Sequence, residues 1–298
     1  MPAKTIYLSY GALSAAALVW GGSIVAQKLA LDWFSAVEVS VLRGLGALLL
    51  LIPFWWWQEG RHAKFSFREA GILTALGLGV LGNHLLTLIG LRYISAGAAG
   101  VIIGAAPAIT AFLSSLLIRD VPFGRVWLGC TVSFAGVALV SGGGDPGQAG
   151  REPWVGALLI VLGLVSWALY SIGSRQMMER LSPLTVNWTT LSLSTVLQVP
   201  LLWADPCAIL GGVDAVPSSG WLALIYLIVF ATAFGQQAWL YGVQGVGPAR
   251  AGIFINLIPV SALLLSTVVL GDPIGVKELA GIVLILSGVW LVTRVERP

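Results

Sequence analysis

The chain has 298 residues, of which 57% are hydrophobic and 10% are charged, and its mean hydropathy is +0.92. A soluble domain carries roughly 25% charged residues, so this composition argues against a soluble globular protein and indicates a surface in contact with lipid. The net charge of +3 comes without a long basic run, which argues against nucleic-acid binding. The two cysteines and two histidines are scattered, so we expect no metal, cofactor or catalytic centre.

Ten apolar stretches follow one another along the chain, each close to the roughly 20 residues that a helix needs to cross a bilayer. Charged or turn-forming residues, such as those between Asp120 and Pro122, separate them. The predicted spans are residues 6–30, 35–57, 69–92, 97–118, 124–142, 154–178, 183–203, 219–243, 248–270 and 275–293. This pattern predicts an all-α, multi-pass membrane protein of the cell inner (plasma) membrane.

Lysine and arginine in short loops accumulate on the cytoplasmic side of a membrane protein. With a cytoplasmic N-terminus, eleven of the 16 basic residues fall on the inside. The inside set is Lys4, Arg61, Lys64, Arg68, Arg119, Arg125, Arg175, Arg180, Arg250, Arg294 and Arg297. Four fall outside and Arg43 lies within a span, so we predict that both termini are cytoplasmic.

The two halves of the sequence resemble each other at a nearly constant offset. A shift of 147 residues places Trp20 on Trp167, and a shift of 152 residues places Pro107 on Pro259. The further matches are Pro53 with Pro200, Trp56 with Trp203, Asp120 with Asp272, Gly129 with Gly281 and Gly136 with Gly288. Residues 1–147 and 148–298 are thus predicted to be two five-helix repeats. Because each repeat has an odd number of spans, the second repeat enters the membrane from the opposite side and is inverted. In transporters with inverted repeats, the substrate site lies near the midplane of the bilayer.

Several local patterns are similar to those of the drug/metabolite transporter superfamily, in particular its EamA-type members. They are Leu18-Val-Trp-Gly-Gly-Ser23, its counterpart Leu164-Val-Ser-Trp-Ala-Leu-Tyr170, and the Ala-Ala-Pro107 and Leu-Ile-Pro259 segments. Within this superfamily the chain most resembles YddG-type exporters. The resemblance implies export of aromatic and other amino acids through a cavity that both repeats line.

Polar side chains within the spans are the first candidates for that cavity. Asn83 and His84 lie in the third span, and Gln236 and Gln237 lie in the eighth, with Gln236 as the repeat counterpart of His84. Amides and imidazole bind a carboxylate or an ammonium without the cost of burying a full charge. The alternative is hydrogen bonding between helices.

Aromatic side chains at mid-helix positions are the second set. Tryptophan is usually found at membrane interfaces, so the matched, mid-helix Trp20 and Trp167 are unusual. Together with Tyr170 and Trp239 they predict an aromatic wall for an apolar side chain and for an ammonium above the π face. Ordinary core packing is the alternative.

Pro107 and Pro259 interrupt the fourth and ninth spans at equivalent points, and each removes a backbone hydrogen bond. We expect hinges there, with the carbonyls of Ile103 and Ile255 released for a ligand. Asn256, beside the second break, is a further predicted substrate-binding residue. A simple structural kink is the alternative.

Arg43 lies roughly 12 Å along the second span, at 1.5 Å per residue. It is placed either to bind a substrate carboxylate or to pair with Glu38 at the membrane surface. Its repeat counterpart is the neutral Thr190.

No acidic residue lies at mid-membrane, where proton- and sodium-coupled carriers often hold a buried carboxylate. We therefore expect uncoupled, facilitated transport by alternating access, with His84 as the proton site if coupling exists.

A carrier of sugar phosphates, nucleotide-sugars or drugs is the alternative, although phosphates favour several buried cations. An enzyme that modifies lipid is the alternative of another class. Amino acids or similar metabolites and the bilayer are the expected partners, with no obligate protein partner.

Overall fold

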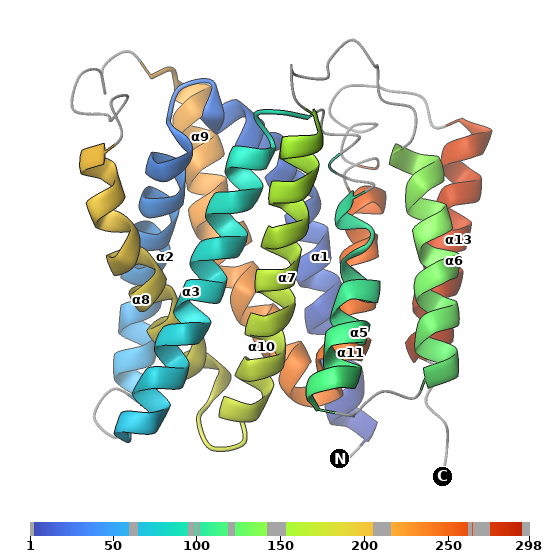
Figure 1. Ribbon diagram of the computed structural model, residues 1–298, viewed down its shortest axis with the longest axis horizontal. Helices are drawn as coiled ribbons and strands as arrows, with labels where there is room; N and C mark the ends of the chain where they lie inside the picture. The colour runs from blue at the N-terminus through green and yellow to red at the C-terminus, as the bar shows by residue number, and fades with distance from the viewer. Residues whose placement is uncertain are drawn as a thin grey trace.

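The computed structural model is a bundle of helices and describes residues 3–59, 65–94, 99, 102–118, 123–141, 153–204, 216–261, 264 and 275–293. No strand occurs within these residues. The elements, shown in Figure 1, are α1 (Ala3–Leu31), α2 (Ala36–Gln58), α3 (Phe67–Gly90), α5 (Ala106–Leu117), α6 (Phe123–Ser141), α7 (Pro153–Met177), α8 (Pro183–Ala204), α9 (Ser218–Tyr226), the π-helix η4 (Leu227–Phe234), α10 (Gly235–Val246), α11 (Pro248–Gly252), the 3₁₀ helix η5 (Ile253–Asn256) and α13 (Val276–Thr293).

Seven of the predicted spans correspond to single helices: α1, α2, α3, α6, α7, α8 and α13. In the described part of the chain, five helical segments are long and apolar enough to cross a membrane, namely Thr5–Leu31, Ala36–Gln58, Phe67–Gly90, Pro153–Met177 and Ser218–Val246. The total of ten spans remains a prediction, because the fourth and ninth stretches lie partly outside the described residues.

Three predicted spans differ from a regular helix. The eighth contains the π-helix η4 between α9 and α10. In the fourth, Gly104 and Ala105 form a turn before α5 begins, with Pro107 in the first turn of α5. In the ninth, the chain passes from α11 through η5 before helix resumes at Leu257, two residues before Pro259. Hydropathy does not distinguish these forms, because an apolar residue fits a π, 3₁₀ or α turn equally well.

Equivalent helices of the two halves run in opposite directions. Figure 1 shows α1 rising from the end of the bundle at which α7, its repeat counterpart, finishes. The last described helix, α13, ends where α1 begins. We refer to this side as the α1-start end. The antiparallel arrangement agrees with the predicted inverted repeat.

The helices α6 and α13 pack through glycines, and Gly129 and Gly136 of α6 each contact one of α13. A Cβ atom on Gly136 would lie 2.5 Å from the carbonyl oxygen of Gly281, and one on Gly129 would lie 2.8 Å from that of Gly288. Gly129 and Gly281 are sequence counterparts, as are Gly136 and Gly288. Each glycine therefore meets the counterpart of the other, which is the contact pattern that a pseudo-twofold axis produces.

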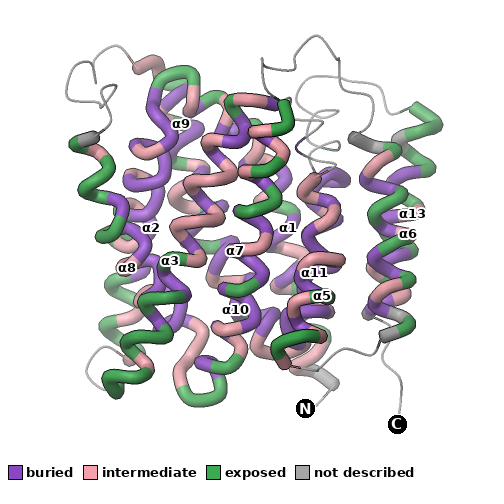
Figure 2. Tube along the Cα trace, viewed as in Figure 1, coloured by how far each residue is buried: buried purple, intermediate pink, exposed green. Residues whose placement is uncertain are grey.

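Large apolar side chains cover much of the outside of the bundle. Leu49, Leu222 and Val283 are each more than 60% exposed, and Figure 2 shows exposed positions along the outer faces of α8, α6 and α13. A soluble monomer does not present so much apolar surface. A surface of this kind is stable in contact with lipid chains.

Candidate functional site

A central cavity of about 120 Å³ lies between the two halves of the chain. This volume is below the roughly 300–1,000 Å³ typical of pockets for drug-sized ligands, so the cavity suits a small metabolite. The lining comes from α1, α2 and α3 of the first half and from α7, η4, α10 and η5 of the second. The residues are Trp20, Ser23, Ile24, Gln27, Arg43, Asn83, His84, Thr87, Leu91, Ile103, Leu164, Trp167, Ala231, Gln236, Ile255 and Ile258.

Arg43 supplies a positive charge to this lining. The side chain is buried, and its Nε donates a hydrogen bond of 2.9 Å to Oγ1 of Thr232 in η4. No described residue is recorded as a counter-ion of Arg43. The carboxylate of Glu38 accepts from the backbone N–H of Ser35 and caps α2. A guanidinium has five N–H donors, and one of them is engaged with a described side chain, that of Thr232.

The π-helix η4 fixes two residues of the other half. Thr232 Oγ1 donates to the carbonyl of Leu227, five residues earlier, at 2.7 Å, and accepts from Arg43. The carbonyl of Ala231 accepts the indole N–H of Trp20 at 2.9 Å. The wider π turn presents backbone and side-chain acceptors sideways, and such segments are frequent at functional sites. Here η4 joins α1 and α2 at the level of the cavity.

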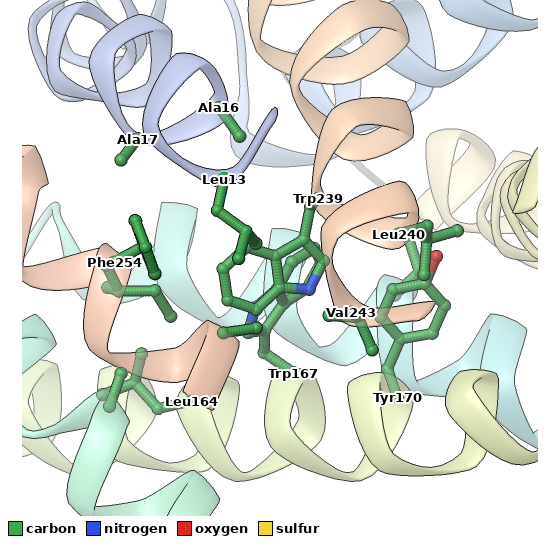
Figure 3. Packing of buried hydrophobic residues seen from close by; sticks show 14 of the residues in the cluster. Leu13, Ala16, Ala17, Leu164, Trp167, Tyr170, Trp239, Leu240, Val243 and Phe254 are labelled. Carbon is green, nitrogen blue, oxygen red and sulfur yellow. The ribbon is translucent and has the colours of Figure 1, made fainter. Parts of the chain in front are cut away.

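Three tryptophans form one aromatic cluster beside the cavity. The ring centroids of Trp20 lie 5.5 Å from those of Trp167 and Trp239, and the last two lie 5.7 Å apart. Tyr170 packs on Trp167 at 5.2 Å, and Figure 3 shows Trp167, Tyr170 and Trp239 among the aliphatic side chains of the core. Tilted and edge-on pairs at such distances are favourable, so the cluster is a preformed wall.

Amide groups complete the polar part of the lining. Gln236 Nε2 donates to the hydroxyl of Tyr170 at 3.2 Å, while its buried Oε1 has no hydrogen-bond partner. Asn83 Nδ2 donates to the carbonyl of Gly163 at 3.1 Å. His84 lies in the same lining and is buried. An unpaired buried oxygen is costly.

Six of the ten predicted binding residues thus line the cavity: Trp20, Arg43, Asn83, His84, Trp167 and Gln236. The other four lie outside the lining, and each has a structural partner. Tyr170 and Trp239 support the wall from behind, and Trp239 Nε1 donates to Ser171 Oγ at 3.1 Å. Gln237 accepts from Asn187 Nδ2 at 3.0 Å, and Asn256 donates to Ser133 Oγ at 2.8 Å.

Three polar lining residues were not predicted from the sequence. Ser23 and Gln27 lie three and seven residues after Trp20, and Thr87 lies three residues after His84. This spacing places them on the same helical faces. Including the polar residues three, four or seven positions after Trp20 and His84 would have identified all three from the sequence. Ile103 and Ile255, whose carbonyls were expected near the breaks, also line the cavity.

The cavity lies away from the α1-start end. Its α1 residues begin at Trp20, and its α3 residues begin at Asn83, near the end of that helix. Between the cavity and the α1-start end, α1 packs directly on α10 and η5. The rings of Tyr10 and Phe254 stack at 5.6 Å, and a Cβ on Gly242 or Gly245 would collide with Leu13 or Ser9. We call this set of six residues the gate contact.

These features define a multi-pass helical membrane protein with a small, polar and aromatic cavity at the junction of two antiparallel halves. Within the described residues, no group of His, Cys, Asp or Glu is placed to hold a metal ion. A solved crystal structure matches 98% of this chain and 96% of its own with a TM-score of 0.76 and 18% identity, which establishes the fold.

The model of the EamA-like transporter family matches the chain twice, over residues 8–142 and 154–294. The chain belongs to this family, and it is therefore a transporter and not an enzyme. An uncharacterized transporter of Archaeoglobus fulgidus is 27% identical over 92% of this chain and 95% of its own length. The uncharacterized inner membrane transporter YedA of Escherichia coli K12 is 26% identical over 95% and 90%, respectively.

Proposed function

We propose that this transporter exports amino acids, aromatic ones in particular, from the cytoplasm by alternating access through the central cavity. The observation that carries this proposal is the combination of a single buried guanidinium, Arg43, with the Trp20–Trp167 wall and with no acidic residue in the described lining. Arg43 would bind the substrate carboxylate. The indole faces would receive the ammonium, and the wall would hold the side chain.

The charge of the cavity favours a zwitterion over a phosphorylated substrate. A sugar phosphate brings about two negative charges, and their desolvation is offset only by several buried cations. Arg43 is the one guanidinium in the described lining, and the remaining polar groups are neutral amides, hydroxyls and the His84 imidazole. We therefore place the sugar-phosphate and nucleotide-sugar carriers second.

Uncoupled transport is part of the proposal, because no carboxylate in the described lining is placed to carry a proton or bind sodium. His84 is the group whose ordinary titration range permits coupling.

Flux into or out of sealed vesicles that contain the purified protein tests both the substrate class and the absence of proton coupling. The labelled substrates are phenylalanine, alanine and glucose 6-phosphate, each with and without an imposed pH gradient. We expect amino-acid flux that the pH gradient leaves unchanged. Sugar-phosphate flux without amino-acid flux contradicts the substrate class, and acceleration by the gradient that His84→Gln abolishes contradicts the uncoupled mechanism.

The aromatic wall gives the proposal a residue-level test. Replacing Trp167 by Leu keeps an apolar side chain but removes the ring, and aromatic pairs contribute about 0.5–1.5 kcal/mol. We expect the KM for phenylalanine to rise roughly three- to tenfold, with a smaller change for alanine. Trp203→Leu is the matched control, because Trp203 is 87% exposed and is not part of the lining. Equal changes for both substrates would show that Trp167 has a packing role alone.

A further inference from the structure

A second cavity, of about 180 Å³, lies at the α1-start end of the bundle. Its walls come from the first turns of α1 at Ile6, the end of α5 at Ile118, the end of α7 at Arg175, and the α10–α11 turn from Gly245 to Arg250. Elements of both halves therefore surround it. This position within the bundle differs from the lipid-facing periphery, where a headgroup site would lie.

Two arginines face this space, and the described part of the chain offers neither of them a counter-ion. Arg175 and Arg250 are both partly buried, and the described lining contains no acidic residue. Arg180, which forms an ion pair with Glu69 at 2.9 Å, is not part of this lining. Two like charges in one partly desolvated space repel each other. An anion that bridges the two guanidinium groups relieves this repulsion and accepts charge-assisted hydrogen bonds.

The gate contact separates the two cavities. Gly245 belongs both to the gate contact, where it meets Ser9, and to the lining of the second cavity. Beyond the gate contact, Trp20 begins the lining of the central cavity. A molecule that enters from the α1-start end thus meets Arg175 and Arg250 before the gate and Arg43 after it.

The arginine pair occurs in one half of the pseudo-symmetric sequence. The repeat counterpart of Arg175 is Lys28, but that of Arg250 is Ala98. The first half therefore has one cation at the two equivalent sequence positions. The two halves differ in charge at these positions, although their helices are related by the repeat.

We propose that the second cavity is an entry site that binds the carboxylate of the substrate between Arg175 and Arg250 before the gate contact opens. This inference rests on the proposed function and on the predicted orientation, which makes the α1-start end cytoplasmic. The site concentrates amino acids at the cytoplasmic mouth, while the substrate gradient sets the direction of net flux.

Arginine modification tests the site without requiring transport. Wild-type protein in nanodiscs of phosphatidylcholine is treated with phenylglyoxal, and modification of each arginine is followed by peptide mass spectrometry. We expect L-phenylalanine to slow modification of Arg175 and Arg250 roughly fivefold, while phenethylamine, which lacks the carboxylate, does not. Arg68, an exposed arginine at the start of α3, is the internal control and should be unaffected.

The outcomes separate this inference from the proposed function. Protection of Arg175 and Arg250 in a protein that shows no phenylalanine flux supports the site and contradicts the export function. Flux without protection overturns the site and leaves the function intact. Protection that depends on phosphatidylglycerol in the nanodisc, and not on phenylalanine, also overturns it, because the occupant is then a lipid phosphate.

A transport measurement gives a second check in vesicles of known sidedness. We expect Arg250→Gln and Arg175→Gln each to raise the KM for phenylalanine presented at the α1-start end roughly fivefold relative to the KM at the opposite end. Arg68→Gln makes the same change of charge on the same side and controls for surface potential. An equal shift in Arg68→Gln, or no sided shift in either variant, overturns the entry site.

Discussion

At the scale of single residues, the position of Arg43 depends on a partner from the other half of the chain. Thr232 Oγ1 accepts from Arg43 Nε at 2.9 Å and donates to Leu227 at 2.7 Å. The hydroxyl thereby fixes the guanidinium in one direction within the cavity. A side chain as long as arginine otherwise loses about 1.5–2 kcal/mol of rotamer entropy when a ligand orders it.

Thr232→Val tests this positioning role, because it keeps the shape of the side chain and removes the acceptor. We expect the KM for phenylalanine to rise roughly three- to tenfold, since a hydrogen bond to a charged group is worth about 1.5–3 kcal/mol and part of that is recovered by water. Alanine should lose affinity to the same degree, because both substrates share the carboxylate.

Thr131→Val is the control for that substitution. Thr131 is an exposed residue of α6 whose hydroxyl donates to the carbonyl of Trp127 at 2.9 Å. The same chemical change there should leave transport unaltered. A loss that affects phenylalanine alone would contradict a role for Thr232 through Arg43.

At the scale of elements, α6 and α13 associate through backbone contact. Lipid chains are as apolar as the helices, so hydrophobic burial does not drive this pairing, and small residues that admit close approach do. Gly136 faces the carbonyl of Gly281 and the amide nitrogen of Ile285, which are backbone atoms that cannot rotate away. The pair therefore depends on the absence of a Cβ atom at this position.

Gly136→Ala should separate the two helices. A methyl group at 2.5 Å from Gly281 O and 2.8 Å from Ile285 N forces a backbone shift, and overpacking of this kind costs about 1–3 kcal/mol. We expect the unfolding midpoint in detergent, measured by size-exclusion chromatography after heating, to fall by roughly 3–10 °C.

Gly124→Ala is the matched control on the same helix, because a Cβ at Gly124 meets nothing within 4 Å. Alanine is the better helix former by about 1 kcal/mol, so this control should be neutral or slightly stabilising. Equal losses in both variants would mean that α6 and α13 do not depend on close backbone approach.

At the scale of the whole molecule, the two cavities lie on opposite sides of the gate contact, in a bundle whose two halves are pseudo-symmetric. The central cavity lies beyond the gate contact, on the side away from the α1-start end, and the second cavity lies before it. When one half rocks against the other about their junction, the contact can open on one side of the central cavity and close on the other. The breaks before Pro107 and Pro259 lie beside that junction, which is why we propose them as hinges.

Reporter fusions test the predicted orientation. A fluorescent protein fused after residue 298 should fluoresce, because it folds in the cytoplasm, whereas alkaline phosphatase at the same point should be inactive. Alkaline phosphatase fused after residue 147, between the two predicted repeats, should be active, since five spans end outside. The reverse pattern would place the termini outside and would make the proposed entry site an exit site.

The sequence by itself determined the class of the protein, the position of most helices and the correspondence between its halves. Helix bounds for α2, α3, α6, α7, α8 and α13 agree with the predicted spans within two residues, because about 20 apolar residues in a bilayer have few alternatives to a helix. Much of the composition of the cavity could also be predicted from the sequence, because Trp20, His84 and Gln236 are unusual residues within apolar spans.

The tertiary structure alone decided which polar groups meet. It placed Thr232 against Arg43 through a π turn, and it assigned Gln237 and Asn256 to contacts between helices. It also brought Arg175 and Arg250 to one cavity. These pairs join residues far apart in the sequence, and hydropathy treats all their faces alike. The rotation of each helix depends on packing against its neighbours, which neither its length nor its composition specifies.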